Sequence, residues 1–583
     1  MVLFGWLAVT EMQAGPVRTW TGGSGSSSNW SDSANWTGNL PGGAGSPIIF
    51  NNAVRLESTN DIVAGTFGTI TFQSGAGAFI FSGNAATLIG GVVNETTLLQ
   101  TILFDITMSG GNTFSAVAGG SLRLGGVLSG TTLTKDGAGS LILEGANTYT
   151  GVTTISAGVV NLRNGSALGA TTAGTTVASG AALELQGDIA VGAEALTING
   201  SGVGGTGVLR NVSGNNSYAG QITLGSAATI GSTAGTLTLS GGIGGNFAKT
   251  FTGAGNIAVS GVVSGSGGLV KQGSGTLTLT GDNSYTGVTT VSEGVLNIRH
   301  SGALGATSSG TTVASGAALQ LQNGIAVGAE ALTLNGSGVG GTGALRNISG
   351  NNSYAGQITL GSAATVGSSA GRLNLTGDIG GNFAKTFTGA GDISVSGVVS
   401  GSGGLVKQGD GTLTLTGANS YTGVTTVSDG VLNIRHSSAL GATSSGTTVA
   451  SGAALQLQNG IAVGAEALTL NGSGVGGTGA LRNISGNNSY AGLITLGSAA
   501  TIGSSAGTLT LTGGIGGNFA KTFTGAGNIT VSGVVSGSGG LVKQGNGTLT
   551  LTGTNSYTGS TTIQGGVLQV GTGGSLGGTS QVV

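Results

Sequence analysis

Short runs in which apolar residues alternate with Thr, Ser, Asn or Gln recur along almost the whole chain. Examples are TLTLTG at 276–281, GVLNIRH at 294–300, EALTLNG at 330–336 and QITLG at 357–361. This period of two is typical of strands with one buried face, and clusters of Gly, Ser and Asn separate the runs. No stretch combines a sustained 3.6-residue apolar period with capping residues. The pattern therefore predicts an all-β protein with essentially no helix.

The strand pattern itself repeats with a period of 136 residues. A lysine opens the same glycine-rich segment four times, at Lys135, Lys271, Lys407 and Lys543. The resulting copies are 135–270, 271–406, 407–542 and a partial copy at 543–583. The second and third copies differ at only 11 of 136 positions. Such near-identity indicates duplication and predicts a uniform array.

Two all-β architectures fit this pattern, a string of sandwich domains and a β-solenoid in which each coil hydrogen-bonds to the next. After residue 47 the chain has no proline and no tryptophan, and its apolar residues are mostly single Leu, Val or Ile. A solenoid suits both features, because every coil donates its N–H groups to a neighbour and the core is narrow. Glycine suits the tight corners. Coils of roughly 20–25 residues would give about six per copy and about 25 in a rod made of the whole chain.

The N-terminal segment differs from the rest, since all four tryptophans and all three prolines lie within the first 47 residues. We expect 16–50 to form a cap and 51–134 to form degenerate coils. Within 1–15, the apolar run Val2–Val9 precedes Ala14 at the position of a cleavage site. This segment is either the remnant of a secretory signal or an apolar first strand or cap. No apolar run reaches 18 residues, so the sequence predicts no transmembrane helix.

Composition narrows the classes of function. The chain has 583 residues, of which 17 are basic and 19 acidic, and its net charge is -2. The lack of a basic stretch argues against nucleic-acid binding, which depends on neutralising phosphates. The lack of cysteine excludes thiol catalysis, disulfides and thiolate metal sites, and it is compatible with export. Glycine is abundant at 125 residues, but 38% hydrophobic residues with low charge is not a disordered composition.

Few side chains qualify as ligands or catalysts. His300 and His436 occur once per copy, and Asn164 stands at their place in the first copy. Six coils separate the two histidines, which is too far for one metal site, so we expect solvent-facing corner residues. One glutamate per copy also recurs, at Glu194, Glu330 and Glu466. We expect these three to be solvated strand-edge charges.

The remaining acids and glycine-rich loops also lack a catalytic pattern. The second copy holds Asp282, Glu293, Glu330, Asp378 and Asp392, balanced by five basic residues. A paired-carboxylate enzyme needs two or three acids in one cleft, and several of these are absent from neighbouring copies. The loops at 204–207 and 241–246 lack the Asp of calcium-binding solenoids, and 202–207 lacks the lysine of a phosphate loop. GTSQ at 578–581 has no His–Asp framework. We predict no catalytic, cofactor-binding or metal-binding residue.

A tyrosine recurs in the segment N-x-Y-T-G, at Tyr149, Tyr285, Tyr421 and Tyr557. We expect these to be corner residues that cover a coil edge with an aromatic face. Stacking against carbohydrate is the alternative.

The segment GSGGLVKQGSGTLTLTGDNSYTGVTTVSEGVL at 265–296 resembles the passenger-associated transport repeat of bacterial autotransporters. The motif occurs at Leu133–Gly158, Leu269–Gly294, Leu405–Gly430 and Leu541–Gly565. NWSDSANWTGNLPG at 29–42 is similar to the opening of many secreted bacterial proteins with such repeats. The resemblance implies a right-handed parallel β-helix passenger that is exported and displayed on the outer membrane or released. It brings no catalytic residue, and 543–583 departs from the family because no translocator barrel is found there.

Together these observations predict a non-enzymatic exported passenger at the surface of a bacterium or released from it, an adhesin- or aggregation-like scaffold. Equivalent faces repeat along the array, so weak contacts can add. The expected partners are a host-cell or matrix surface, carbohydrate, or further copies of the chain, with no nucleic acid and no cofactor. Two alternatives stay open: an extracellular matrix or surface-layer fibre protein, and a β-helix polysaccharide lyase or hydrolase.

Overall fold

The computed structural model describes residues 15–41, 45–578 and 581–583; Val2–Val9 and Ala14 therefore lie outside the described residues. The chain is all-β and forms a parallel β-solenoid of about 25 turns, as the alternating pattern predicted. Helix in the described part consists of short 3₁₀ turns, η1 (Ser33–Asn35), η2 (Val203–Gly205), η3 (Val339–Gly341) and η4 (Val475–Gly477). No helix in this part is long and apolar enough to cross a membrane.

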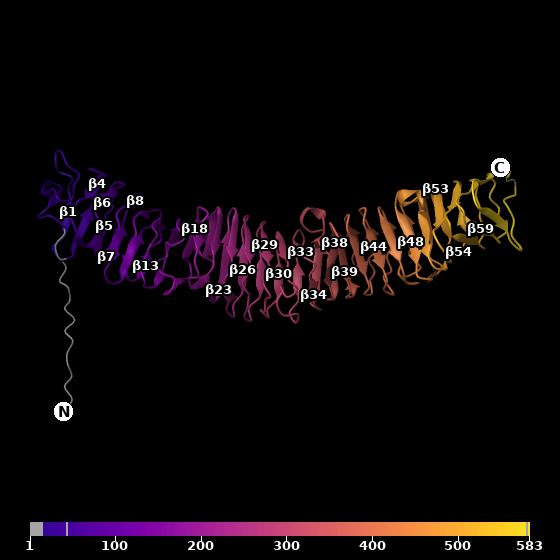
Figure 1. Cartoon of the computed structure of the whole chain (residues 1–583), viewed down its shortest axis with the longest axis horizontal. Coiled ribbons are helices and arrows are strands. Elements are labelled where there is room, and N and C mark those ends of the chain that lie inside the picture. The colour runs from indigo at the N-terminus through magenta and orange to yellow at the C-terminus, as the bar shows by residue number, and fades with distance from the viewer. Residues whose placement is uncertain (1–14, 42–44, 579–580) are drawn as a thin grey trace, which may run out of the picture. The chain divides into compact units, whose positions relative to one another are not determined.

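Internal contacts divide the chain into two compact units, Met1–Gly287 and Val288–Val583. Successive coils of each unit stack in sequence order, as the colour gradient in Figure 1 shows. The division falls inside the second copy rather than between copies. Within each unit nearly identical copies stack in the same way, so the end of a copy is not marked by any change in packing.

The first copy shows the strand order that recurs in the others. Its strands are β13 (Leu133–Asp136), β14 (Ser140–Leu143), β15 (Thr153–Ile155), β16 (Val159–Leu162), β17 (Thr175–Val177), β18 (Ala182–Gln186), β19 (Ala190–Val191), β20 (Leu196–Gly200), β21 (Leu209–Ser213), β22 (Asn215–Tyr218), β23 (Ile222–Ser232), β24 (Thr236–Leu239), β25 (Ile243–Gly244), β26 (Lys249–Thr252) and β27 (Asn256–Val259). Each pairs in parallel with a strand one coil further on, for example β13 with β15 and β14 with β16. The exception is β25, whose Ile243 forms an isolated parallel bridge with Val263. Bonds between equivalent corners span 20 residues in the motif coils and 27 residues where the η2 loop is inserted.

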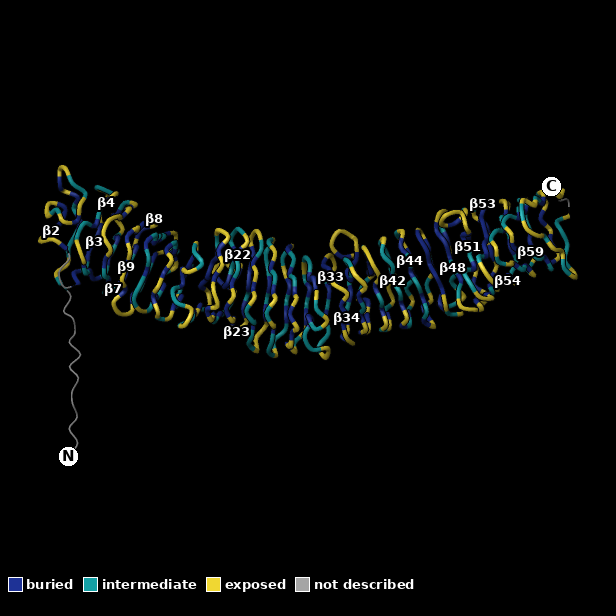
Figure 2. The backbone as a smooth tube through the Cα atoms, viewed as in Figure 1, coloured by how far each residue is buried: buried dark blue, intermediate teal, exposed yellow. Residues whose placement is uncertain are grey.

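The two sides of the coil carry different residue types. Ile155 and Val177 are register partners and both are fully buried. Their neighbours Thr154 and Thr176 are also register partners and face outward. β-Branched residues suit a pleated surface on both sides, so the alternation fixes which side is the core. Figure 2 shows the same arrangement, with buried segments along the strands and exposed segments at the corners.

The N-terminal coils have an aromatic core, unlike the aliphatic core expected for the chain after residue 47. Strand β1 (Arg18–Trp20) pairs antiparallel with β2 (Trp36–Thr37) and parallel with β3 (Ser46–Phe50). The ring of Trp30 packs edge-on against Phe81, with ring centroids 5.2 Å apart. The other buried aromatic residues here are Trp20, Trp36, Phe50, Phe67, Phe72, Phe79, Phe104 and Phe114. Large rings fill these first coils, where the repeat motif is absent.

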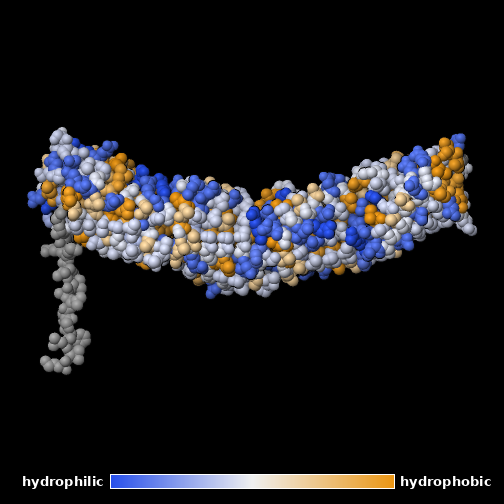
Figure 3. Space-filling view, viewed as in Figure 1, coloured by the Kyte–Doolittle hydropathy of each residue, from blue (hydrophilic) through white to orange (hydrophobic). Residues whose placement is uncertain are grey.

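The last motif coil is less well covered than its counterparts. Ile563 of β60 (Thr561–Ile563) and Val570 of β61 (Val567–Val570) are 40% and 46% exposed. The equivalent Val427 and Ile434 of the third copy are fully buried under the following coil. Figure 3 shows the resulting gathering of apolar side chains at the C-terminal coils.

Candidate functional site

The lysine that opens each repeat points into the coil. Lys135, Lys271, Lys407 and Lys543 are at most 3% exposed. Lys407 Nζ donates hydrogen bonds to the carbonyl oxygens of Gln408, at 2.9 Å, and Asp429, at 3.1 Å, and to that of Gly409. Burial lowers the pKa of Lys407 to about 8. The lysine therefore closes a corner by satisfying carbonyl groups. In the sequence, the burial of this lysine is indicated by its position two residues after an inward-facing leucine.

The asparagine of the motif connects three successive coils. Asn419 Oδ1 accepts a hydrogen bond from Val399 N at 2.8 Å, one coil earlier. Its Nδ2 donates to Ala439 O at 2.7 Å, one coil later. Asn147 makes the same pair of bonds in the first copy, at 2.8 and 2.6 Å. The role of this residue is structural.

The motif tyrosines do not cover a coil edge, so that expectation was wrong. Tyr149, Tyr285, Tyr421 and Tyr557 have an exposed fraction of 0%. The hydroxyl of Tyr421 lies 2.7 Å from Thr425 Oγ1. A ring of this size gains more by filling the core than by lying on a corner, and it leaves no face for stacking against a sugar.

The recurrent glutamates are buried, which contradicts their expected role as solvated edge charges. Glu194, Glu330 and Glu466 are at most 2% exposed. Burial raises the pKa of each to about 7, opposed by a hydrogen bond from a threonine. The cause lies one coil further on, where a glycine lets the backbone pass directly over the glutamate. A Cβ at Gly220 would overlap the carbonyl of Glu194.

The two histidines lie at corners, half-buried rather than fully facing solvent. His300 Nδ1 accepts a hydrogen bond from Gly302 N at 3.1 Å, and His436 Nδ1 accepts one from Ser438 N at 3.1 Å. Asn164 does the same in the first copy, with Oδ1 2.9 Å from Ser166 N. A shared turn geometry therefore explains why His and Asn exchange at this position.

The structure brings the other candidate acids into no cluster. No group of three or more His, Cys, Asp or Glu in the described part is placed to hold a metal ion. Asp378 and Asp392 accept backbone hydrogen bonds from Val398 and Thr412, one coil further on, at 2.8 and 3.0 Å. Arg372 lies 3.8 Å from Asp392 and lines a surface hollow of about 500 Å³ with it.

The glycine-rich segments compared with calcium and phosphate loops are turns and short strands. The loop at 202–207 contains the η2 turn, and 241–246 contains strand β25. GTSQ at 578–581 lies partly outside the described residues.

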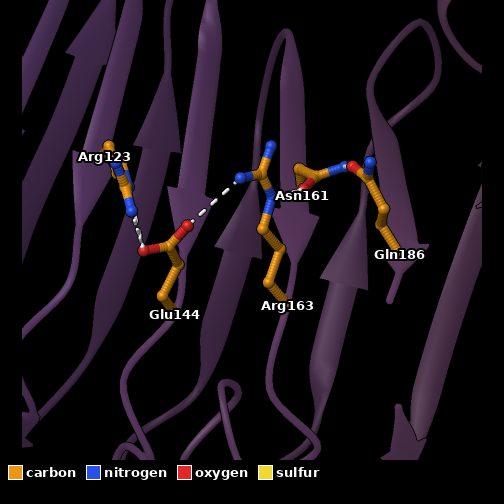
Figure 4. A network of polar contacts seen from close by, with 5 residues as sticks. All are labelled: Arg123, Glu144, Asn161, Arg163 and Gln186. Atoms are coloured by element: carbon orange, nitrogen blue, oxygen red, sulfur yellow. Dashed lines mark hydrogen bonds and ion pairs between the residues drawn. The ribbon is translucent and has the colours of Figure 1, made fainter. Parts of the chain in front are cut away.

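Outward side chains of the first copy and of the coil before it form a charged ladder, drawn in Figure 4. Glu144 lies between Arg123 of β11 (Ser121–Leu124) and Arg163, at 2.8 and 3.1 Å. On the next strands, Asn161 Nδ2 donates to Gln186 Oε1 at 3.2 Å. These pairs are partly exposed, so each contributes little to stability by itself.

The same ladder continues with an ion pair that only the first copy has. Glu184 of β18 is the register partner of Arg210 of β21, and the two side chains are ion-paired. In the other copies a glutamine takes the place of the glutamate: Gln320 faces Arg346, and Gln456 faces Arg482. The described part contains no carboxylate paired with either of these two arginines. Aligning the copies shows the exchange, but only the coil geometry shows what the residue faces.

Arg482 lines a surface pocket of about 320 Å³ in the third copy. The other lining residues are Gly477, Thr478, Ser504, Ser505, Thr524, Gly525 and Ala526. Arg482 Nε donates to Ser505 Oγ at 2.8 Å, and Nη1 donates to Thr478 Oγ1 at 2.9 Å. Gly503 stands between Arg482 and Thr524 in the register and has no side chain, which leaves a notch in the outer face.

The geometry defines a parallel β-solenoid whose recurrent motif supplies its interior and its corners. The model of the passenger-associated-transport-repeat family matches residues 133–162, 269–298, 405–434 and 541–570. Four matches at a spacing of about 136 residues show that the chain carries the passenger-associated transport repeat of autotransporter passengers, as the motif predicted. No curated protein and no solved structure matches the chain.

Proposed function

We propose that this chain is an exported passenger that stands at the surface of a bacterium, or is released from it, and acts as a non-enzymatic adhesive scaffold. The family of the repeat supports a location outside the cell or at the outer membrane surface. The observation that carries the scaffold role is the use of the motif residues. Lys407, Asn419 and Tyr421 bond only to the solenoid itself, so the outer faces carry the contacts with partners.

The repeat supplies the mechanism of adhesion. Nearly identical outer faces recur every 136 residues, and linked weak sites bind a partner surface more tightly than a single site does. Because the net charge is low, electrostatic repulsion is weak when such faces approach a surface or one another.

Location is tested on intact cells of the organism that makes the protein. An antibody against the chain should label these cells, and added protease should remove the label while a cytoplasmic marker stays intact. A chain that protease reaches only after lysis would contradict the proposal.

Adhesion is tested by changing the length of the array. Removing 407–542 joins residue 406 directly to residue 543. The register of the coils is preserved, because residues 407 and 543 both open the same motif. Multivalent contact predicts that attachment falls by about tenfold, well beyond the loss of mass. Attachment that falls only in proportion to length would point to independent contacts and contradict the mechanism.

A further inference from the structure

We propose that Arg346 and Arg482 each form a binding site for the acidic groups, carboxylate or sulfate, of a polysaccharide. The equivalent site of the first copy, at Arg210, is closed by Glu184. This site adds a ligand class to the proposed function. It rests on that function, because only an exported chain meets such a polymer.

In both arginines, hydrogen bonds hold the guanidinium group in place while its Nη2 atom stays available as a donor. Arg482 uses Nε and Nη1 on Ser505 and Thr478. Arg346 makes the same bonds, to Ser369 at 2.8 Å and Thr342 at 3.0 Å. For Nη2 of either arginine, the described residues offer no acceptor within hydrogen-bond distance. A guanidinium fixed by two hydroxyl groups loses little freedom when it binds a planar acid.

The first copy shows which chemistry this edge accepts. There Arg210 Nη1 donates to Thr206, and Nη2 bonds to Oε1 of Glu184. Gln320 and Gln456 stand in the place of this carboxylate in the other copies. They accept hydrogen bonds from Asn297 and Asn433, and neither gives Arg346 or Arg482 a charged partner. An external carboxylate, or a sulfate of similar geometry, completes the same charge-assisted pair.

The surroundings of Arg482 favour a hydroxylated ligand. Thr478, Ser505 and Thr524 place three hydroxyl groups around the guanidinium. The pocket of about 320 Å³ is at the small end of ligand sites and suits a single sugar unit. The notch at Gly503 is fixed by the fold, because a Cβ there would overlap the carbonyl of Thr478. A polymer of acidic sugars can occupy the sites of both copies, whereas nucleic acid needs many phosphate contacts that this chain cannot supply.

The test uses the whole chain and three immobilised polymers: polygalacturonate for carboxylate, dextran sulfate for sulfate, and neutral dextran. The variant Gln320→Glu with Gln456→Glu reproduces the closed first-copy site in both positions. We expect it to bind the acidic polymer about tenfold more weakly. The reverse change, Glu184→Gln, opens the site at Arg210, and we expect tighter binding.

The control is Thr359→Glu with Thr495→Glu, which adds the same charge. These threonines lie on β38 (Ile358–Ser368) and β53 (Ile494–Ser504), at the other end of each strand from Gly367 and Gly503. We expect affinity within about twofold of the unchanged chain. Because the first copy folds with Glu184, loss of binding in the glutamate variant does not reflect misfolding; circular dichroism checks this.

The proposal is overturned if neither acidic polymer binds, if the control loses as much affinity as the paired variant, or if DNA binds as tightly. Binding of one acidic polymer alone supports it and decides between carboxylate and sulfate. A chain that is exposed on intact cells but ignores acidic polymers overturns this site and leaves the proposed function standing. A chain hidden from protease until lysis overturns the proposed function instead.

Discussion

Thr175 Oγ1 donates a hydrogen bond of 2.5 Å to Oε1 of Glu194 inside the solenoid. The pair recurs as Thr447 and Glu466, also at 2.5 Å, and as Thr311 and Glu330. Each copy therefore carries one buried acid whose carboxyl group is hydrogen-bonded, within the described part of the chain, by a threonine on the strand one coil earlier. A carboxyl group in this setting favours its neutral form, because water no longer stabilises the charge.

We expect the stability of the chain to fall as the pH rises from about 4.5 to about 7. Burial raises the pKa of Glu194, Glu330 and Glu466 from 4.5 to about 7 in the folded chain. Between these values the folded state binds more protons than the unfolded state. The contribution of each protonated glutamate to the free energy of unfolding is about 3 kcal/mol. It is fully present below pH 4.5 and is lost as the pH rises through 7. Guanidinium midpoints at several pH values measure it.

The matched variants separate this effect from general changes in charge. Replacing the three glutamates by glutamine should flatten the pH dependence in this window. Glu144→Gln, at an outer-face glutamate paired with two arginines, should leave most of it. Titration of the buried lysines does not overlap this pH window, because burial lowers the pKa of Lys135 and Lys407 only to about 8. Midpoints that stay constant from pH 4.5 to 7 in the unchanged chain would refute this account.

Two buried tyrosines should respond in opposite ways to loss of the hydroxyl group. Tyr421→Phe removes a bond of 2.7 Å and leaves the buried hydroxyl of Thr425 without it, which should cost about 1 kcal/mol. The hydroxyl of Tyr490 has no partner in the described part of the chain, although its ring is fully buried. Tyr490→Phe should therefore be neutral or stabilising. Equal losses of denaturation midpoint in both variants would contradict this difference.

All the lysines of the chain should resist amine-reactive reagents in the folded state. The seven lysines are buried, namely Lys135, Lys249, Lys271, Lys385, Lys407, Lys521 and Lys543. Their Nζ atoms donate to carbonyl oxygens, so attack requires local opening of a coil. Labelling with an N-hydroxysuccinimide ester, followed by peptide mass spectrometry, should be at least about tenfold slower than in guanidinium. Equal rates in both conditions would show that these side chains are exposed.

The period-two pattern was sufficient to predict the strands and their inward side. It failed at Glu194 and Tyr149, which lie between strands, because alternation has no meaning where the chain turns a corner. Their burial depends on a backbone segment one coil away, such as Gly220 above Glu194. The pairing of Glu184 with Arg210 was hidden for a related reason. The two residues are 26 positions apart, since the inserted loop makes this coil longer than its neighbours.

The asparagine that joins three coils should be the least replaceable residue of the motif. Asn419→Ala leaves Val399 N and Ala439 O without their partner, and two unsatisfied buried backbone groups should cost about 2–4 kcal/mol. Asn419→Asp keeps the acceptor for Val399 but sets a buried carboxylate oxygen against Ala439 O, so it should destabilise the chain at least as much as alanine does. Asn374→Ala, on the outer face of β39 (Arg372–Leu375), is the control and should change stability by less than about 0.5 kcal/mol. Hydrogen exchange at Val399 measures the local effect, because this amide should lose protection in Asn419→Ala. Unchanged protection at Val399 in the alanine variant would mean that the side chain does not hold the coils together.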